Sequence, residues 1–224
     1  IEQNLNFMVE QINEINFEII LIENGSTDNS YYYLQYYIIP SILQKDPFIK
    51  LKLFQSSKGL SEAIILGLTH AFGEISYITT DDLPFGISDL LYFLDNKNNF
   101  DLKKEILLGS KEHPESNVIR TRKRIIMSKI YKYLRFIILN SLIKDTQGSI
   151  IAQTSIIKNF VNLYQPKKFN FNTSFVFYCE KKGILVSEIP IDLSASKRNK
   201  STVNLQSVFS MFLNLFYLKF SKKF

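Results

Sequence analysis

The stretch that decides the fold is FEIILIENGSTDNS, residues 17–30. Its first part, Phe17–Ile22, is a short apolar run of the kind that forms a buried strand in a parallel sheet. Its second part, Asn24–Ser30, is a polar turn that ends in residues typical of a helix N-cap. Sheets built from strand, turn and helix bind ligands beyond the carboxyl ends of their strands, so this turn is a candidate site.

The same rhythm continues on both sides of this stretch. A helix is predicted before it at 4–15 and after it at 31–43. Further strands are predicted at 48–54, 75–79, 105–108 and 184–189, and further helices at 59–72, 86–94, 120–143 and 205–220. This order predicts an α/β fold with a mostly parallel sheet flanked by helices.

Composition narrows the classes of protein that remain. The chain has 224 residues, and 46% of them are hydrophobic, which excludes a disordered chain. One cysteine and two histidines exclude a disulfide framework, a four-cysteine zinc site and a histidine-rich metal centre. The sequence contains no uninterrupted apolar run of roughly 18 residues, so a complete transmembrane helix is not expected. Because it opens on Ile1 and not on Met, we expect further residues to precede it.

Positive charge is concentrated in the second half of the chain. The 27 Lys and Arg exceed the 21 Asp and Glu, which gives a net charge of +6. Residues 111–144 carry a net charge of +7 and residues 194–224 a net charge of +6, so the rest of the chain is acidic on balance. It predicts an anionic partner: a phosphate-bearing ligand, an anionic lipid or a nucleic acid. No aromatic platform or recognition motif accompanies the basic residues, so nucleic acid is the disfavoured partner.

The helix at 120–143 has two faces. Apolar side chains gather on one side, and most basic ones, including Arg124, Lys132 and Arg135, gather on the other. The helix at 205–220 has a wide apolar face. We expect both to lie on a membrane surface, with apolar faces toward acyl chains and basic residues toward head groups. Burial of the last helix, or a contact in a homo-oligomer, is the alternative.

Two carboxylates, Asp81 and Asp82, follow the strand at 75–79. Carboxylates on such a turn can hold a hard divalent cation that bridges substrate phosphates. The alternative is an ordinary capping pair before the next helix. The turn at residues 24–30 offers backbone N–H groups at a helix start, which suits an anion or a ribose, but turns of this composition are also common without any ligand.

Taken together and in order, these segments resemble glycosyltransferase family 2. The resemblance rests on residues 19–30, on GLSEAIILGLTHAFG at 59–73 and on YITTDDLPF at 77–85. GSK at 109–111, DTQGS at 145–149 and SEIPIDL at 187–193 follow the order of its polyprenyl-phosphate hexosyltransferase subgroup, the relatives of dolichol-phosphate mannose synthase. The family has a GT-A fold, which is Rossmann-like. The resemblance implies a nucleotide-sugar donor, a UDP- or GDP-sugar, together with a divalent metal and a lipid-phosphate acceptor.

The resemblance also implies roles for particular residues. It places the donor beside Glu23, Asn24, Lys58 and Asp81, with Arg198 and Lys200 closing over its diphosphate. It places Mg²⁺ or Mn²⁺ on Asp82, assisted by Asp81. Asp145 would lie at the acceptor and orient it, and Asp82 would act in catalysis through the metal. Lys111, Arg120 and Arg122 would meet the acceptor phosphate.

The sequence departs from the family pattern at three points. Thr80 replaces the first Asp of the usual metal-binding Asp-x-Asp motif. Leu60 stands where many relatives have a basic residue, which leaves Lys58 as the nearest candidate. The family's first strand, which surrounds the nucleoside, is not in this sequence.

The sequence therefore predicts a metal-assisted hexosyltransferase, peripheral on the cytoplasmic face of a membrane. Residues 1–193 would form the GT-A domain, and residues 194–224 a basic loop with a C-terminal amphipathic helix. The acceptor phosphate would attack the anomeric carbon directly, as in the family. A saccharide or glycan acceptor, or a scaffold with a degenerate donor site, are the alternatives.

Overall fold

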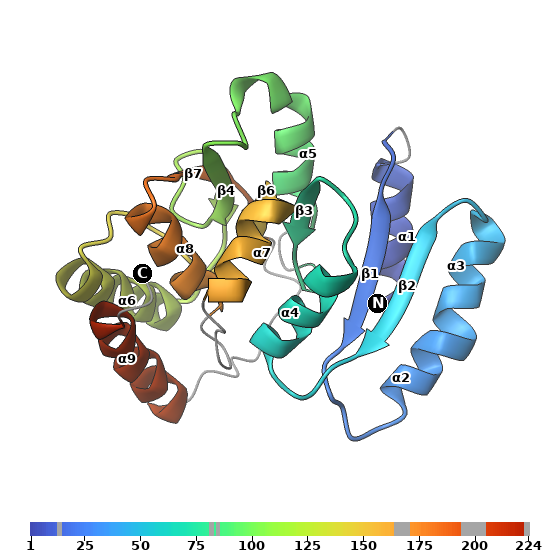
Figure 1. Ribbon diagram of the computed structural model, residues 1–224, viewed down its shortest axis with the longest axis horizontal. Helices are drawn as coiled ribbons and strands as arrows, with labels where there is room; N and C mark the ends of the chain where they lie inside the picture. The colour runs from blue at the N-terminus through green and yellow to red at the C-terminus, as the bar shows by residue number, and fades with distance from the viewer. Residues whose placement is uncertain (13–14, 81–82, 84–85, 164–170, 194–204, 222–224) are drawn as a thin grey trace. The chain divides into compact units, whose positions relative to one another are not determined.

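The computed structural model describes residues 1–12, 15–80, 83, 86–163, 171–193 and 205–221 (Figure 1). The chain forms two compact units. Unit 1 comprises residues 1–76 and 154–171, and unit 2 comprises residues 77–153 and 172–224. The predicted domain boundary after residue 193 falls next to a segment outside the described residues, so it stays a prediction.

Unit 1 is built around the two parallel strands β1 and β2. Its elements are α1 (Glu2–Gln11), β1 (Glu18–Glu23), α2 (Ser30–Tyr33), the π-helix η1 (Leu34–Ile38), α3 (Ile39–Lys45), β2 (Lys50–Gln55), α4 (Leu60–His70), the start of β3 (Ile75–Ile78) and α7 (Thr154–Leu163). Glu23 at the end of β1 lies opposite Gln55 at the end of β2. The two strands therefore end at the same edge of the sheet.

Both faces of this pair of strands are covered. Ile19 packs into a buried cluster with Leu5 of α1 and Ile42 of α3. Side chains that point to the opposite face meet α4: Gly67 lies against Ile22, and the Phe54 ring stacks on His70 with centroids 3.8 Å apart. Burial on both faces explains why β1 reads as a continuous apolar run.

Unit 2 holds a sheet whose strands follow the order β3-β6-β4-β7. Its elements are α5 (Ser88–Asp95), the 3₁₀ turn η2 (Lys97–Asn99), β4 (Glu105–Ser110), β5 (Asn117–Val118), α6 (Arg122–Leu139), β6 (Ile150–Gln153), α8 (Phe171–Lys181), β7 (Leu185–Pro190), β8 (Asp192–Leu193) and α9 (Leu205–Phe220). β4 pairs parallel with β7 and antiparallel with β6, and β5 pairs parallel with β8. The central part of this sheet is fully buried, since Ile106, Leu107 and Leu108 of β4 are 0% exposed.

Every predicted helix and strand is present, with ends shifted by a few residues. α6 ends at Leu139 and not at 143, because Asn140 takes a left-handed conformation with φ 57°. The sequence did not predict β6, whose antiparallel pairing interrupts the parallel sheet. A four-residue apolar run has no periodicity of its own, which is why the pattern missed it.

No helix in the described part of the chain combines the length and the apolar character that crossing a bilayer requires. α6 and α9 lie side by side in unit 2 (Figure 1).

Candidate functional site

The turns after β1 and β2 meet at the edge of unit 1. The Oδ1 of Asn24 accepts a hydrogen bond of 2.6 Å from the backbone N–H of Gly59. Gly25 has φ +59°, and a Cβ at this position would lie 2.7 Å from the backbone nitrogen of Lys58. Only glycine allows this approach, so the structure brings together three of the predicted donor residues: Glu23, Asn24 and Lys58.

Glu23 is the buried carboxylate of this edge. Its Oε1 accepts a 2.7 Å hydrogen bond from the N–H of Ser26, and its Oε2 accepts a 2.9 Å bond from Gln55. Burial acts to raise the pKa of Glu23, but these hydrogen bonds outweigh burial and hold the pKa below its ordinary value. Glu23 is therefore an ionised acceptor that already organises the turn.

The predicted metal ligands Asp81 and Asp82, and the predicted loop residues Arg198 and Lys200, lie outside the described residues. No group of three or more His, Cys, Asp or Glu side chains placed to hold a metal ion occurs among residues that the structure describes. The assignment of metal to Asp81 and Asp82 therefore stays a prediction.

In unit 2 the GSK and DTQGS segments are pressed together. A Cβ on Gly148 would lie 1.6 Å from the carbonyl oxygen of Gly109, and a Cβ on Gly109 would lie 2.5 Å from the Oγ of Ser149. Two glycines at the contact thus let the backbones approach closely. The approach places Lys111, two residues after Gly109, beside Asp145.

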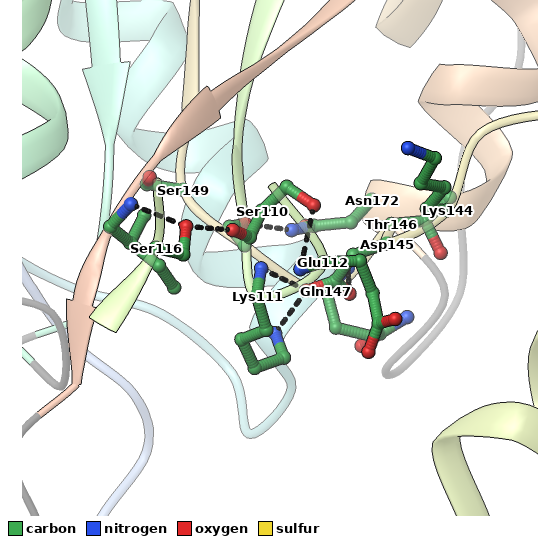
Figure 2. Close-up of polar contacts among 12 residues, drawn as sticks. Ser110, Lys111, Glu112, Ser116, Lys144, Asp145, Thr146, Gln147, Ser149 and Asn172 are labelled. Atoms are coloured by element: carbon green, nitrogen blue, oxygen red, sulfur yellow. Dashed lines mark hydrogen bonds and ion pairs between the residues drawn. The ribbon is translucent and has the colours of Figure 1, made fainter. Parts of the chain in front are cut away.

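Lys111 and Asp145 form a buried ion pair (Figure 2). The Nζ of Lys111 lies 2.5 Å from Oδ2 of Asp145, and the backbone N–H of Lys111 donates to the same oxygen at 3.0 Å. Burial alone would raise the pKa of Asp145, but the Lys111 charge and hydrogen bonds outweigh it and hold the pKa below its ordinary value. Asp145 is therefore ionised at neutral pH and fixes the ammonium group of Lys111.

Glu188 of β7 holds this arrangement from the other side. Its Oε1 accepts hydrogen bonds from Ser110 Oγ at 2.6 Å and from the N–H of Asp145 at 2.9 Å. Its Oε2 accepts a third from the N–H of Lys144 at 3.2 Å. One carboxylate therefore ties β4, β7 and the segment that carries Asp145 together.

A small cavity of about 70 Å³ opens beside this ion pair. It is lined by six cationic side chains and two carboxylates, together with Ser128, Tyr131, Thr146 and Gln147; the charged ones are Lys111, Arg120, Lys129, Lys132, Arg135, Lys144, Glu112 and Asp145. Charges of one sign in a concave site raise the local concentration of the opposite ion. The cavity therefore favours a small anion.

The three predicted acceptor residues are not all brought together. Lys111 and Arg120 line the cavity, and Arg120 Nη2 pairs with Glu112 at 2.8 Å. Arg122 is the first residue of α6, is exposed and is not among the residues that line the cavity.

Arg135 contradicts the sequence-based interpretation of α6. The spacing predicts it on the basic face of a helix that lies on a membrane surface, but it is only 1% exposed and lies in the cavity wall. Burial lowers the pKa of the Arg135 guanidinium, and the nearby charges of Asp145, Glu180 and Glu188 oppose this shift without cancelling it. The predicted apolar face is partly exposed, with Ile126, Ile130 and Ile137 about half exposed, and its contact with a membrane stays a prediction.

Sequence reasoning gave no role to Glu188 or Arg135. Glu188 lies within a motif that the resemblance rests on, SEIPIDL, so an acidic residue there was the available signal. Arg135 had no signal, since its spacing on α6 matches that of the basic residues around it.

Comparison with known proteins identifies the family. The family model "Glycosyl transferase family 2" matches residues 1–152. The dolichyl-phosphate beta-glucosyltransferase of Saccharomyces cerevisiae is 23% identical over 205 residues, which cover 86% of this chain and 61% of that protein. The chain thus spans less than two thirds of this relative.

Solved structures share the fold. Glucosyl-3-phosphoglycerate synthase from Mycobacterium tuberculosis, in complex with Mn²⁺, UDP-glucose and phosphoglyceric acid, gives a TM-score of 0.62 at 14% identity, over 96% of this chain and 76% of that one. 4-Diphosphocytidyl-2C-methyl-D-erythritol synthase from Anaerococcus prevotii gives a TM-score of 0.53 at 15% identity, over 96% of this chain and 84% of that one. These likenesses confirm the predicted GT-A fold. Because the family model matches well over half of its residues, the chain belongs to glycosyl transferase family 2.

Proposed function

We propose that this chain transfers a hexose from a nucleoside-diphosphate sugar to the phosphate of a polyprenyl lipid. The observation that carries the proposal is the cavity of unit 2, where cationic side chains outnumber carboxylates six to two. A saccharide acceptor carries hydroxyl groups and has no use for this excess of positive charge. A phosphate acceptor is bound by it through charge-assisted hydrogen bonds.

The size of the cavity fits this proposal. At about 70 Å³ it is far smaller than the roughly 300–1,000 Å³ of pockets that enclose a whole drug-sized ligand. It suits an anionic head group whose lipid chain stays outside. The yeast relative is named as a dolichyl-phosphate enzyme, which favours the same class of acceptor.

In the proposed reaction an oxygen of the acceptor phosphate attacks the anomeric carbon. A new bond forms between that carbon and the phosphate oxygen, and the bond to the nucleoside diphosphate breaks, so that the diphosphate leaves with its electron pair. The attacking oxygen is already ionised at neutral pH, so the chain needs no strong general base. Lys111 and Arg120 hold the phosphate, and Asp145 orients it by fixing the Lys111 ammonium group 2.5 Å away.

The donor is proposed to bind at the edge of unit 1 where Glu23, Asn24 and Lys58 meet. The carboxylates of Asp81 and Asp82 are donors of the kind that Mg²⁺ and Mn²⁺ prefer, so these residues would hold the metal. A divalent ion bound there would stabilise negative charge on the departing diphosphate. We keep the proposal, based on the family resemblance, that Asp81, Arg198 and Lys200 also contact the nucleotide-sugar donor.

We further propose that unit 2 docks on an anionic membrane surface. Exposed apolar side chains lie on the two adjacent helices α6 and α9; they are Ile126, Ile130, Tyr133, Phe136, Ile137, Leu213, Phe216, Tyr217 and Phe220. Contiguous exposed apolar surface marks an interaction site. Exposed Lys123, Lys129 and Lys219 on the same helices suit acidic head groups.

The test is a transfer assay with the full chain and Mn²⁺, in which labelled UDP-glucose and GDP-mannose are each offered with three acceptors: a polyprenyl phosphate, a free oligosaccharide and phosphoglyceric acid. We expect label in the lipid phosphate only, and none without metal. Transfer to the oligosaccharide alone would refute the lipid-phosphate acceptor. The absence of transfer and of donor binding would instead indicate a degenerate scaffold.

Phosphoglyceric acid is included because a fold neighbour binds it together with UDP-glucose. Transfer to this small acceptor would support the cavity as a phosphate-binding site and would refute the polyprenyl lipid as the acceptor. The matched variants are Lys111→Met, which alters the cavity, and Lys103→Met, an exposed lysine outside it. The proposal expects at least a tenfold loss of kcat/KM in the first variant and less than a twofold change in the second.

A further inference from the structure

Arg135 is the most deeply buried cation in the wall of the unit 2 cavity. It is 1% exposed, and its guanidinium carbon lies 5.5 Å from the centre of the Tyr131 ring on the same helix. Its Nη2 donates a 3.0 Å hydrogen bond to the carbonyl of Lys144. The guanidinium is thus held in place by the residue that precedes Asp145.

The other two nitrogens of this guanidinium are unused. Among the described residues, Arg135 Nε and Nη1 are buried without a hydrogen-bond partner, and so is Nη1 of Arg120 in the same cavity wall. Buried N–H groups in native proteins nearly always have partners, because leaving them unpaired is costly, and the more so when they carry charge. Three such groups around one cavity indicate that a ligand supplies the missing acceptors.

Internal carboxylates do not fill this role. Asp145 is engaged by Lys111, Gln147 and its own segment, Glu112 pairs with Arg120, and Glu188 accepts three hydrogen bonds from other groups. Their charges favour the buried guanidinium, but among the described residues no carboxylate lies within ion-pair distance of Arg135. The cavity wall therefore holds N–H donors for which the described residues supply no acceptor.

We propose that Arg135 binds the anion directly, donating from its unpaired N–H groups to a phosphate-type oxyanion, with Nη1 of Arg120 completing the site. Guanidinium groups suit this because they stay charged and carry several N–H donors in one plane. Since Nη2 of Arg135 holds the Lys144 carbonyl, the bound anion also fixes the position of Asp145. The inference deepens the proposed function, on which the identification of the anion as an acceptor phosphate rests.

The first experiment measures binding of inorganic phosphate and of farnesyl phosphate to the full chain by calorimetry, without donor or metal. The variants are Arg135→Gln, Arg135→Lys and, as the matched control, Lys103→Gln, which removes an exposed charge outside the cavity. We expect Arg135→Gln to weaken phosphate binding at least tenfold and Lys103→Gln less than twofold. Arg135→Lys should fall between them, because an ammonium group keeps the charge but loses the planar set of N–H donors.

A folded Arg135→Gln variant that binds phosphate within twofold of wild type would overturn the inference, since Arg135 would then serve only the structure. Circular dichroism and the unfolding midpoint establish whether each variant is folded. Equal Arg135 dependence for both ligands, with tighter binding of farnesyl phosphate, supports a lipid head group as the source. Binding of inorganic phosphate alone would keep the anion site and refute the lipid acceptor.

The second experiment follows the wild-type chain and does not depend on the Arg135 variants being folded. The sequence contains only five arginines: Arg120, Arg122, Arg124, Arg135 and Arg198. Replacing each of the four arginines other than Arg135 with lysine, one at a time, assigns the Nε–H resonance that disappears. The remaining resonance then belongs to Arg135. Phosphate should shift the Arg135 resonance and slow its exchange with solvent, while Arg122 stays unchanged. An unshifted Arg135 resonance at saturating phosphate would refute the inference, whatever the transfer assay gives.

Discussion

The polar edge of unit 1 and the cavity of unit 2 differ in how their polar groups find partners. Around Glu23 and Asn24, the carboxylate and amide oxygens accept hydrogen bonds from the backbone N–H groups of Ser26 and Gly59 and from the side chain of Gln55 at the end of β2. In the cavity, cations exceed carboxylates and three guanidinium nitrogens have no partner among the described residues. The first region is organised without a ligand, whereas the second is incomplete without an anion. Unpaired buried donors therefore indicate a ligand site in unit 2, whereas the polar groups at the edge of unit 1 already have partners.

The largest expected effect on the free energy of unfolding comes from replacing one glycine in each unit with alanine. Gly148→Ala should lower the unfolding free energy by about 3 kcal/mol or more, because its Cβ would lie 1.6 Å from the backbone oxygen of Gly109. Gly67→Ala in α4 has ordinary space, with Ile22 at 3.5 Å, and should leave stability unchanged or raise it by about 0.5–1 kcal/mol. Urea unfolding measures both. Similar losses in the two variants would contradict the close approach of the GSK and DTQGS segments.

The next effect concerns the Lys111–Asp145 ion pair. Lys111→Met leaves Asp145 ionised and buried without its cation, which should cost about 2–3 kcal/mol at pH 7. In the wild type, the pKa of Asp145 is lowered, so its contribution is present above the ordinary aspartate pKa and is lost as pH falls through the lowered pKa. In the variant the pKa of Asp145 should rise, because burial remains while the lysine is gone.

The stability difference between wild type and Lys111→Met should therefore be largest at neutral pH and shrink in acid, where the variant's Asp145 becomes protonated. Unfolding curves at a series of pH values measure this. Lys52→Met, which removes the partner of Glu18 in unit 1, is the control. It should cost less than about 1 kcal/mol, since Lys52 is 36% exposed and water can replace it. A pH-independent deficit in Lys111→Met would show that Asp145 stays charged without its partner.

A smaller effect is expected when one charge is removed at each carboxylate anchor. Glu188→Gln should lower the unfolding free energy by about 2 kcal/mol, because an amide has one acceptor oxygen for three donors. Glu23→Gln should cost about 1 kcal/mol, since the N–H of Ser26 and the side chain of Gln55 lie at the ends of their elements and can readjust. Thermal unfolding orders the two variants. A greater loss at Glu23 would reverse the comparison between the two units.

The smallest effect on stability, and the most specific effect on partners, concerns the exposed apolar side chains. Ile130→Asp with Phe216→Asp should change stability by less than about 0.5 kcal/mol, because both side chains are about half exposed. Sedimentation with vesicles of three parts phosphatidylcholine and one part phosphatidylglycerol should show at least tenfold weaker binding. Tyr36→Asp, an exposed aromatic of unit 1, should bind as wild type does. Unchanged binding in the double variant would refute membrane docking through α6 and α9.

Patterns that repeat along the chain made most of the fold predictable. The apolar run at β1 and the two-faced spacing of α6 and α9 are local signals, and the structure places helices or strands at each of them. Adjacent turns at the strand ends were predictable for the same reason, because parallel strands end at one edge. Glu23, Asn24 and Lys58 lie there as a result.

Contacts between distant segments were not predictable in this way. Glu188 binds residues 78 and 43 positions earlier in the sequence, and no local pattern records such a pairing. Arg135 has the same spacing on α6 as its exposed neighbours, so amphipathicity predicted the wrong environment for it. Burial of a single charge depends on which carboxylates the rest of the fold brings near.

The sequence by itself determined the family, the order of helices and strands, and the excess of positive charge in the second half. Each of these depends on residue type and local spacing, which the chain carries whatever its three-dimensional arrangement. The tertiary structure alone decided that GSK and DTQGS touch, that Glu188 holds Asp145 in place, and that Arg135 turns inward with two donors unused. These features depend on side chains from distant segments competing for the same partners, and only the folded chain sets which of them meet.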